Sequence, residues 1–312
     1  MRQMRPSNLC RSWLFLEGAN ETVLQGAAAS GADVLIQELE DFTQASQRPR
    51  ARALAADLYA AWREAGVVVA VRVNPLEADG MDDLAAVMRG HPDIVALPKV
   101  AEPAHVVRLD EAVTRFERDY GIAEGSTALL PNIELARGLV QTIAIAKASR
   151  RIVGCLMASE DLTNDLGAER GADGVELAYC RQRFIVECVA AGAVAVDCPY
   201  TFSDVAGLVR DVRWARRLGY VAKSLVDPAH AAIVNAALTP SEDELRRSRA
   251  IVAAFEAARV QGRSRAALDG SLVEVPTYSN AKRLIARGEA LRQWERGLQP
   301  DPPPQSGEGR GM

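Results

Sequence analysis

Acidic side chains, and a few cations, follow several of the short apolar runs in this sequence. Asp161 comes after a run that ends at Met157, and Glu134 comes after a run that ends at Leu130. Arg72 directly follows another run. Carboxylates that are not accompanied by His or Cys pairs select hard divalent ions, and Mg²⁺ held by one or two carboxylates keeps positions open for substrate oxygens. The sequence therefore predicts metal-assisted chemistry on an oxygen-rich substrate.

Glu134 and Asp161 end neighbouring strands of the predicted fold, so they can share one ion. Arg72 is always charged and can stabilise negative charge that develops on a substrate oxygen. A Schiff-base role for Lys99 is disfavoured, because nearby carboxylates raise the pKa of an amine that would need to be neutral. For any single one of these charged residues, the alternative to a functional role is a structural one, because strands commonly end at the surface, where charged side chains meet solvent. The set as a whole favours a site, because the opposite strand ends carry no comparable charges.

Eight short apolar runs alternate with helical segments over roughly 230 residues, which predicts a (β/α)₈ TIM barrel whose active site lies at the carboxyl ends of the strands. A doubly wound open sheet is the alternative. That fold would be expected to have a glycine-rich G-x-G-x-x-G turn after the first strand, and the sequence lacks this turn. The charged and polar residues expected at the strand ends are Glu17, Glu38, Glu40, Asp41, Arg72, Asn74, Lys99, Glu134, Glu160, Asp161, Asp197, Lys223 and Asp227.

The helical pattern changes near residue 239. We expect residues 1–238 to form the barrel and residues 239–298 to form a helical extension that docks on the barrel or on a neighbouring subunit. Residues 299–312 are rich in Pro and Gly and are expected to be disordered. An extension that must dock somewhere favours a homo-oligomer.

The composition limits the classes of partner. The 312 residues are 48% hydrophobic and 25% charged, with a formal net charge of −4, which gives no support for nucleic acid or an anionic membrane as a partner. No apolar stretch reaches about 18 residues, the length of a membrane span. The five cysteines lack C-x-x-C spacing, and the first residues lack a secretory pattern. We expect a cytoplasmic protein.

Several short motifs occur in an order that resembles the HpcH/HpaI aldolase and citrate lyase β-subunit-like family, from Arg11 to about Arg287. No motif is decisive alone, but this many in one order is specific. Departures occur at Leu16-Glu17-Gly18, where the family has V-P-G, and at Glu38 and Asp227. The motifs are Arg11-Ser12-x-Leu14-Phe15, Glu38-Leu39-Glu40-Asp41, Val71-Arg72-Val73-Asn74, Leu97-Pro98-Lys99-Val100, Ile133-Glu134-x-Ala136-Arg137-Gly138 and Glu160-Asp161-Leu162.

The resemblance implies a barrel that binds Mg²⁺ through Glu134 and Asp161. It implies that Arg72 contacts the 2-oxo acid and the oxygen that becomes its carbonyl. It also assigns Glu40 and Asp41 to support of the catalytic groups.

Further roles follow from the same resemblance. The segment that ends at Glu17 and Gly18 is expected to line the thioester site, and Lys99 is expected to contact substrate. The family's late motif carries an acid or base from a neighbouring subunit, and its counterpart here contains Glu274. The implied assembly is a trimer or a hexamer.

The function implied is a Mg²⁺-dependent carbon–carbon lyase. Its substrate would be a 3-hydroxyacyl-CoA of the malyl, citramalyl or citryl type, which gives a 2-oxo acid, or oxaloacetate, plus an acyl-CoA. The changes in the thioester-facing segments leave three alternatives open: a malyl-CoA-type thioesterase, an aldolase that cleaves hydroxy acids without CoA, and a metabolite-binding homologue without catalysis.

Overall fold

The computed structural model describes residues 4–297, and the tail expected at residues 299–312 lies outside them. The chain divides into two compact units, Met1–Leu238 and the part from Thr239 onward. Each unit is described here by itself. Among the described helices, none combines the length and the apolar character that a membrane crossing needs.

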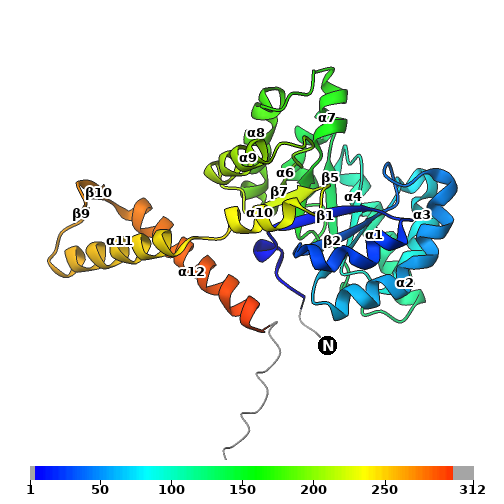
Figure 1. Cartoon of the computed structure of the whole chain (residues 1–312), viewed down its shortest axis with the longest axis horizontal. Helices are drawn as coiled ribbons and strands as arrows, with labels where there is room; N and C mark the ends of the chain where they lie inside the picture. Colours follow the sequence, from blue (N-terminus) through cyan, green and yellow to red (C-terminus); the bar gives the residue numbers. More distant parts are fainter. Residues whose placement is uncertain (1–3, 298–312) are drawn as a thin grey trace, which may run out of the picture. The chain divides into compact units, whose positions relative to one another are not determined.

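Eight parallel strands close into a barrel in the first unit, in the order in which they occur along the chain, so the predicted (β/α)₈ barrel is confirmed (Figure 1). Every neighbouring pair is parallel, and β8 closes the barrel against β1. The strands are β1 (Ser12–Glu17), β2 (Val34–Glu38), β3 (Val68–Arg72), β4 (Ile94–Leu97), β5 (Ala128–Ile133), β6 (Gly154–Met157), β7 (Val194–Asp197) and β8 (Ala222–Leu225).

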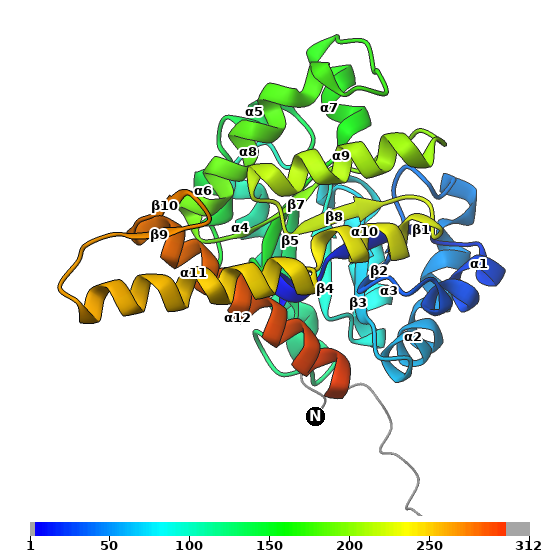
Figure 2. The same ribbon diagram turned by 60° about the vertical axis from the view of Figure 1, so that its left-hand side comes forward.

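Helices follow the strands and surround the barrel, as the turned view shows (Figure 2). They are α1 (Glu21–Gly26), α2 (Arg48–Glu64), α3 (Met81–Val87), α4 (Pro103–Asp119), α5 (Ala136–Leu139), α6 (Thr142–Ala146), α7 (Ser159–Leu166), α8 (Ala178–Ala191), α9 (Val205–Leu218) and α10 (His230–Leu238). The shorter helical turns are η1 (Ser7–Leu9), η2 (Ala27–Ser30), η3 (Ala45–Gln47), η4 (Leu76–Gly80), η5 (Met88–Gly90) and η6 (Val175–Leu177).

Alternation along each strand decides where a side chain points. Trp13, Phe15, Ile36 and Ala70 belong to one buried cluster, which fills the barrel interior. The intervening residues pack against the surrounding helices in a second and larger cluster. Because both faces are covered, the strands read as continuous apolar runs, and the sequence pattern alone does not show which face is which.

Two element boundaries differ from those expected. The sequence pattern predicts a single helix over residues 139–149, but the structure has the two short helices α5 and α6. The Thr142 hydroxyl donates to the carbonyl of Leu139 at 2.9 Å and competes there with the backbone hydrogen bonds. The sequence pattern also predicts that the eighth strand begins at Tyr220, but β8 begins two residues later, at Ala222. Tyr220 follows the end of α9 and is still tied to that helix, since its N–H donates to the carbonyl of Ala215.

Gly138 allows α5 to pack tightly on the segment after β4. A Cβ at this position would lie 2.2 Å from the carbonyl oxygen of Val100, which is backbone and cannot move alone. We expect Gly138→Ala to lower the free energy of unfolding by about 2 kcal/mol, the usual cost of overpacking. Gly26→Ala is the control, because its Cβ would meet no atom within 4 Å. The midpoint of its chemical denaturation should equal that of the wild type or lie slightly above it. Equal midpoints for the two variants would contradict this account.

The second unit is a pair of helices joined by a β-hairpin. It comprises α11 (Glu242–Val260), β9 (Ala266–Leu268), β10 (Ser271–Val273) and α12 (Val275–Gly297). Ser241 and Glu244 form a reciprocal capping box at the start of α11. The hairpin packs through Val273 on Phe255, whose ring stacks on Tyr278 at 4.7 Å. The sequence pattern predicts that the last helix begins at Asn280, but α12 begins five residues earlier, at Val275.

Candidate active site

Arg72 lies at the carboxyl end of β3 among three carboxylates. It shares the face of Val68 and Ala70, so it points into the barrel interior. Its Nε donates to Glu38 Oε1 at 2.9 Å. Its Nη2 lies 3.2 Å from Glu40 Oε2, and its Nη1 lies 3.7 Å from Glu134 Oε2. All four side chains are buried.

The charge on Arg72 is retained despite this burial. Burial alone would lower the pKa of the guanidinium, but Glu38, Glu134 and Glu40 together raise the pKa above its ordinary value. The guanidinium carbon also lies 5.0 Å from the centre of the Phe15 ring, a cation–π contact. Arg72 is therefore a fixed positive charge at the floor of the site.

Glu134 has one engaged and one open carboxylate oxygen. Oε1 accepts a hydrogen bond of 2.6 Å from the backbone N–H of Lys99, whereas Oε2 is buried and accepts no hydrogen bond from the residues that the structure describes. Burial raises the pKa of Glu134 to about 8, and the nearby Asp161 and Glu40 add to the rise while Arg72 opposes it. A buried oxygen without a hydrogen-bond partner, in an excess of negative charge, suits a divalent cation.

Asp161, on the first turn of α7 just after β6, lines a cavity together with Arg72. Glu134 is not one of the residues that line this cavity, but it lies close enough for the charge of Asp161 to raise its pKa. Among residues 4–297, no group of three or more His, Cys, Asp or Glu side chains gathers as a metal site. Two carboxylates fit the preference of Mg²⁺, which retains waters or substrate oxygens at its other positions. Described residues from several strand ends line the cavity: Phe15, Asp41, Phe42, Arg72, Leu156, Ala158, Ser159, Glu160, Asp161, Pro199, Thr201, Ser224 and Val226.

Lys99 links two further acids at the edge of this site. Its Nζ pairs with Glu40 and lies 3.2 Å from Asp41 Oδ2. Partial burial would lower the pKa of the amine, but Glu40 and Asp41 outweigh that effect and raise it above the ordinary value. The amine therefore stays protonated, as expected, and does not suit Schiff-base chemistry.

Glu17 and Gly18, expected to bind substrate, lie outside the cavity that Arg72 lines. Glu17 lines a separate groove with Asn20 and Arg50. The N–H of Gly18 donates to Thr43 Oγ1 at 2.8 Å, and a Cβ on Gly18 would lie 2.4 Å from the carbonyl oxygen of Glu38. Gly18 is thus needed for close packing against the end of β2.

Asp197 and Lys223 were expected among the strand-end charges. Asp197 does end β7, whereas Lys223 lies within β8. Both point outward from the barrel, because Ala222 and Val196, one residue away, point inward. Lys223 Nζ lies 2.7 Å from Asp197 Oδ2 and 2.6 Å from Asp211 Oδ2. The apolar residues before Lys223 look like a complete strand in the sequence. The pattern therefore predicts that Lys223 follows the end of the eighth strand, although it lies within that strand.

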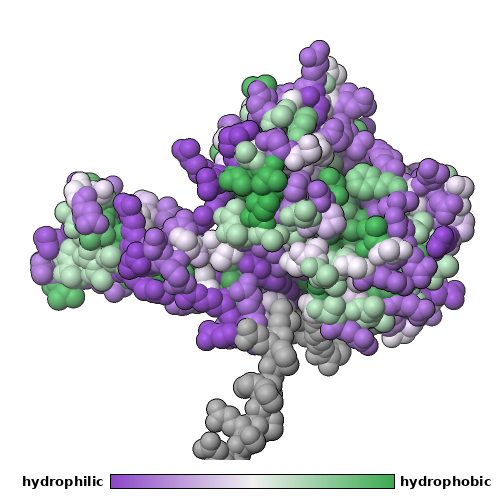
Figure 3. All heavy atoms as spheres, in the orientation of Figure 1, coloured by the Kyte–Doolittle hydropathy of each residue, from purple (hydrophilic) through white to green (hydrophobic). Residues whose placement is uncertain are grey.

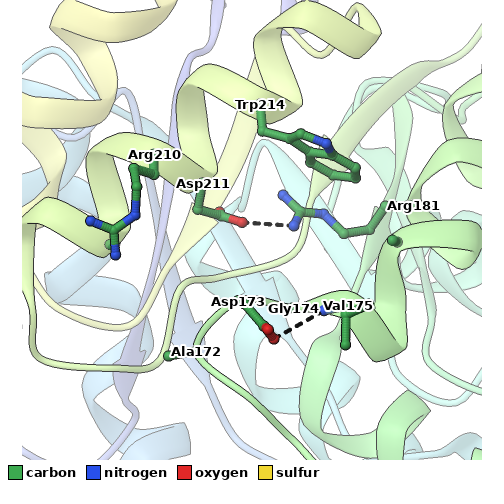
Figure 4. Close-up of a pocket in the computed structure, with 10 residues that line it drawn as sticks. Ala172, Asp173, Gly174, Val175, Arg181, Arg210, Asp211 and Trp214 are labelled. Carbon is green, nitrogen blue, oxygen red and sulfur yellow. Dashed lines mark hydrogen bonds and ion pairs between the residues drawn. The ribbon is translucent and has the colours of Figure 1, made fainter.

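Arg181 completes this outer cluster beside a groove of about 630 Å³. Figure 4 shows its guanidinium directed at Asp211, which it contacts at 2.7 Å, with the Trp214 ring centre 4.5 Å from its Cζ. The guanidinium also pairs with Asp197 at 2.6 Å. The charges of this outer cluster neutralise one another, and none of these side chains lines the cavity at the strand ends.

The other expected strand-end residues take structural or peripheral positions. Asn74 is held by Asp83, and Asp227 is exposed. Glu160 accepts a hydrogen bond of 2.8 Å from Thr201 Oγ1 at the cavity rim. Glu274 belongs to the second unit, where Arg265 pairs with it at 3.0 Å.

Two residues of this region had not been singled out from the sequence. Asn132 lies two residues before Glu134 on the inward face of β5, fully buried, and its amide makes no hydrogen bond with the described residues. Two-residue alternation back from Glu134 would have indicated it. Phe42 lines the cavity from the loop after β2, where no periodic signal marks it.

A closed barrel with a buried cation and metal-compatible carboxylates at its strand ends defines a (β/α)₈ enzyme. Residues 11–228 match the family model described as HpcH/HpaI aldolase/citrate lyase. The citrate lyase subunit beta of Escherichia coli strain K12 is 32% identical over 291 residues, 92% of this chain and 96% of that protein. The chain belongs to the HpcH/HpaI aldolase/citrate lyase family and is a lyase-class enzyme, which confirms the resemblance.

Two further relatives cover most of the chain. A (3S)-malyl-CoA thioesterase of Cereibacter sphaeroides is 30% identical over 283 residues, 90% of this chain and 95% of that protein. The solved structure of CitE from Mycobacterium tuberculosis in complex with magnesium, acetoacetate and coenzyme A is 29% identical, with a TM-score of 0.72. That match covers 89% of this chain and 98% of the solved chain.

Proposed function

We propose that the protein is a Mg²⁺-dependent carbon–carbon lyase. Its substrate is a 3-hydroxyacyl-CoA of the malyl, citramalyl or citryl type, and its products are a 2-oxo acid, or oxaloacetate, and an acyl-CoA. The observation that carries the proposal is the open Oε2 of Glu134, buried beside Arg72 and within the electrostatic influence of Asp161. The magnesium and coenzyme A in the complex of the M. tuberculosis relative support the same assignment.

Glu134 and Asp161 hold the Mg²⁺. When bound, the ion supplies positive charge for the carboxylate and hydroxyl oxygens of the substrate.

Arg72 binds the substrate oxygen that becomes a carbonyl. During cleavage the hydroxyl passes its proton to water, its C–O bond becomes a double bond, and the adjacent C–C bond breaks. The electron pair of that bond passes to the acyl thioester as an enolate, which takes up a proton at carbon. Arg72 stabilises the negative oxygen, and Glu38 and Glu40 hold its guanidinium in place.

Lys99 and Asp41 support this arrangement from the edge of the site. Lys99 pairs with Glu40 and Asp41, and its backbone N–H fixes one oxygen of Glu134. The proton donor to the enolate is Glu274 of a neighbouring subunit. Within its own chain Glu274 is about half exposed, so its carboxylate can be presented to another molecule.

The protein acts as a homo-oligomer, a trimer or a hexamer, in the cytoplasm. Support comes from α8 and the turn before it, which expose Val175, Tyr179, Val186 and Val189, each about 70% accessible. Their spacing places them on one helical face, and Figure 3 shows apolar surface where α8 and α9 lie in Figure 1. Light scattering should give a mass of three or six chains.

Thioester hydrolysis is the second candidate, supported by the identity to the malyl-CoA thioesterase. The assay is the purified protein with Mg²⁺ and malyl-, citramalyl- or citryl-CoA, followed by detection of the 2-oxo acid. A lyase releases a 2-oxo acid and keeps the thioester intact, whereas a hydrolase releases free thiol and no 2-oxo acid. Cleavage of the free hydroxy acids would indicate the CoA-independent aldolase, and no turnover with any of them would indicate a metabolite-binding homologue.

A further inference from the structure

The cavity beside Arg72 has an apolar wall. Phe15, Leu156, Ala158, Pro199 and Val226 all line it, from the ends or loops of four different strands. Phe42 completes the wall from the loop after β2. Most of the wall of this cavity is therefore formed by carbon.

Phe42 is fixed in position although it is 44% exposed. Its backbone N–H donates to Glu38 Oε2 at 2.7 Å, which ties the loop to the same carboxylate that holds Arg72. Its ring lies edge-on to Phe15, with 6.3 Å between the ring centres, and 5.8 Å from the guanidinium carbon of Arg72. An exposed aromatic ring held over the site charge is available for contact with a bound substrate.

The charged residues around this cavity are poorly suited to bind a second anionic group of the substrate. Of the described residues that line it, Arg72 is the one cation, against the carboxylates of Asp41, Glu160 and Asp161. Arg72 is paired with Glu38, Glu40 and Glu134.

The two nearby cations are also engaged. Lys99 is paired with Glu40 and Asp41, and Arg170 with Glu160 and Glu176. A second carboxylate on the substrate would therefore approach a net negative wall without a cation of its own.

The three substrate types of the proposed function differ only in one substituent on the hydroxyl-bearing carbon. It is hydrogen in the malyl type, methyl in the citramalyl type and an anionic carboxymethyl group in the citryl type. We infer, resting on the proposed function, that Phe42 and the apolar wall select a methyl or other small alkyl substituent. The acid product is then a 2-oxo acid with a single carboxylate and an apolar tail.

The test compares the three thioesters with the Mg²⁺-loaded full-length protein, and measures binding of pyruvate, glyoxylate and oxaloacetate by calorimetry. We expect kcat/KM for citramalyl-CoA to exceed that for citryl-CoA by about 100-fold, the scale of leaving a buried charge unpaired. Pyruvate should bind more tightly than either of the other two acids.

Variants at Phe42 test whether its side chain sets the substrate preference by contact with the substrate and not through the stability of the fold. Phe42→Leu keeps an apolar side chain and should keep the order of preference. Phe42→Lys adds a cation and should bring citryl-CoA to within about tenfold of citramalyl-CoA. Both variants should show the wild-type thermal midpoint within a few degrees, since the side chain is partly exposed.

The outcomes for the inference and for the proposed function are distinct. Cleavage of citryl-CoA as fast as citramalyl-CoA, or oxaloacetate as the tightest ligand, would overturn the inference and leave the lyase proposal standing. If none of the thioesters is cleaved, the lyase proposal fails, and the order of binding of the three oxo acids still decides the inference.

Discussion

Replacing Asp161 by Asn is expected to lower kcat/KM of the Mg²⁺-dependent cleavage by about 10³-fold while leaving the protein folded. The substitution keeps the shape of the side chain but removes one of the two charges proposed to hold the ion. Loss of metal-ion stabilisation of developing charge costs several kcal/mol in the transition state, which corresponds to a factor of this size. Steady-state kinetics over a range of Mg²⁺ concentrations measures the change, and calorimetry should show weakened Mg²⁺ binding.

Glu160→Gln is the matched control, because Glu160 neighbours Asp161 at the start of α7 and lines the same cavity. Its amide oxygen can still accept the hydrogen bond from Thr201, so kcat/KM should change by less than about tenfold. If Asp161→Asn retained full activity in the presence of a chelator, Asp161 would not be a ligand of a catalytic metal ion.

Arg72→Ala is expected to abolish measurable turnover and also to destabilise the protein by about 3–5 kcal/mol. The substitution leaves Glu38, Glu40 and Glu134 buried without the cation that they share, and unpaired buried charge carries a cost of this size. Chemical denaturation measures the stability, and single-turnover kinetics measures the residual activity. Arg72→Lys should recover part of the stability but little of the activity, because one ammonium cannot bind three carboxylates with the geometry of a guanidinium.

Lys223→Met is the control for this double effect. Lys223 is as deeply buried as Arg72 and also pairs with carboxylates, but it lies on the outer face of the barrel. Its replacement should cost a similar free energy of unfolding and leave kcat of the folded fraction within about threefold of the wild type. A loss of kcat as large as that of Arg72→Ala would contradict the separation of the two charge clusters.

The barrel could be predicted because every strand is covered on both faces and every run between turns is short and apolar. Glu134 and Asp161 could be predicted for a related reason. Glu134 directly follows such a run and Asp161 comes shortly after one, in the first turn of the next helix, so the closing of the barrel places them at the same end. Arg72 ends its strand on the inward face and was found in the same way.

Other features depend on information that a run of apolar residues does not carry. Lys223 is a charged residue in mid-strand, and only the register of β8 shows that it points outward to Asp197 and Asp211. The packing of Gly18 depends on the loop after β2, which no periodicity predicts. Phe42 lies in that loop as well. Any contribution of Glu274 to another subunit depends on a second chain.

The most direct test of the central claim is the stoichiometry of products from citramalyl-CoA with the purified protein. The account predicts one pyruvate and one intact acetyl-CoA for each substrate consumed, with no free thiol. It predicts that a chelator stops the reaction and that added Mg²⁺ restores it. Free CoA thiol without pyruvate, or undiminished cleavage in the presence of the chelator, would contradict it.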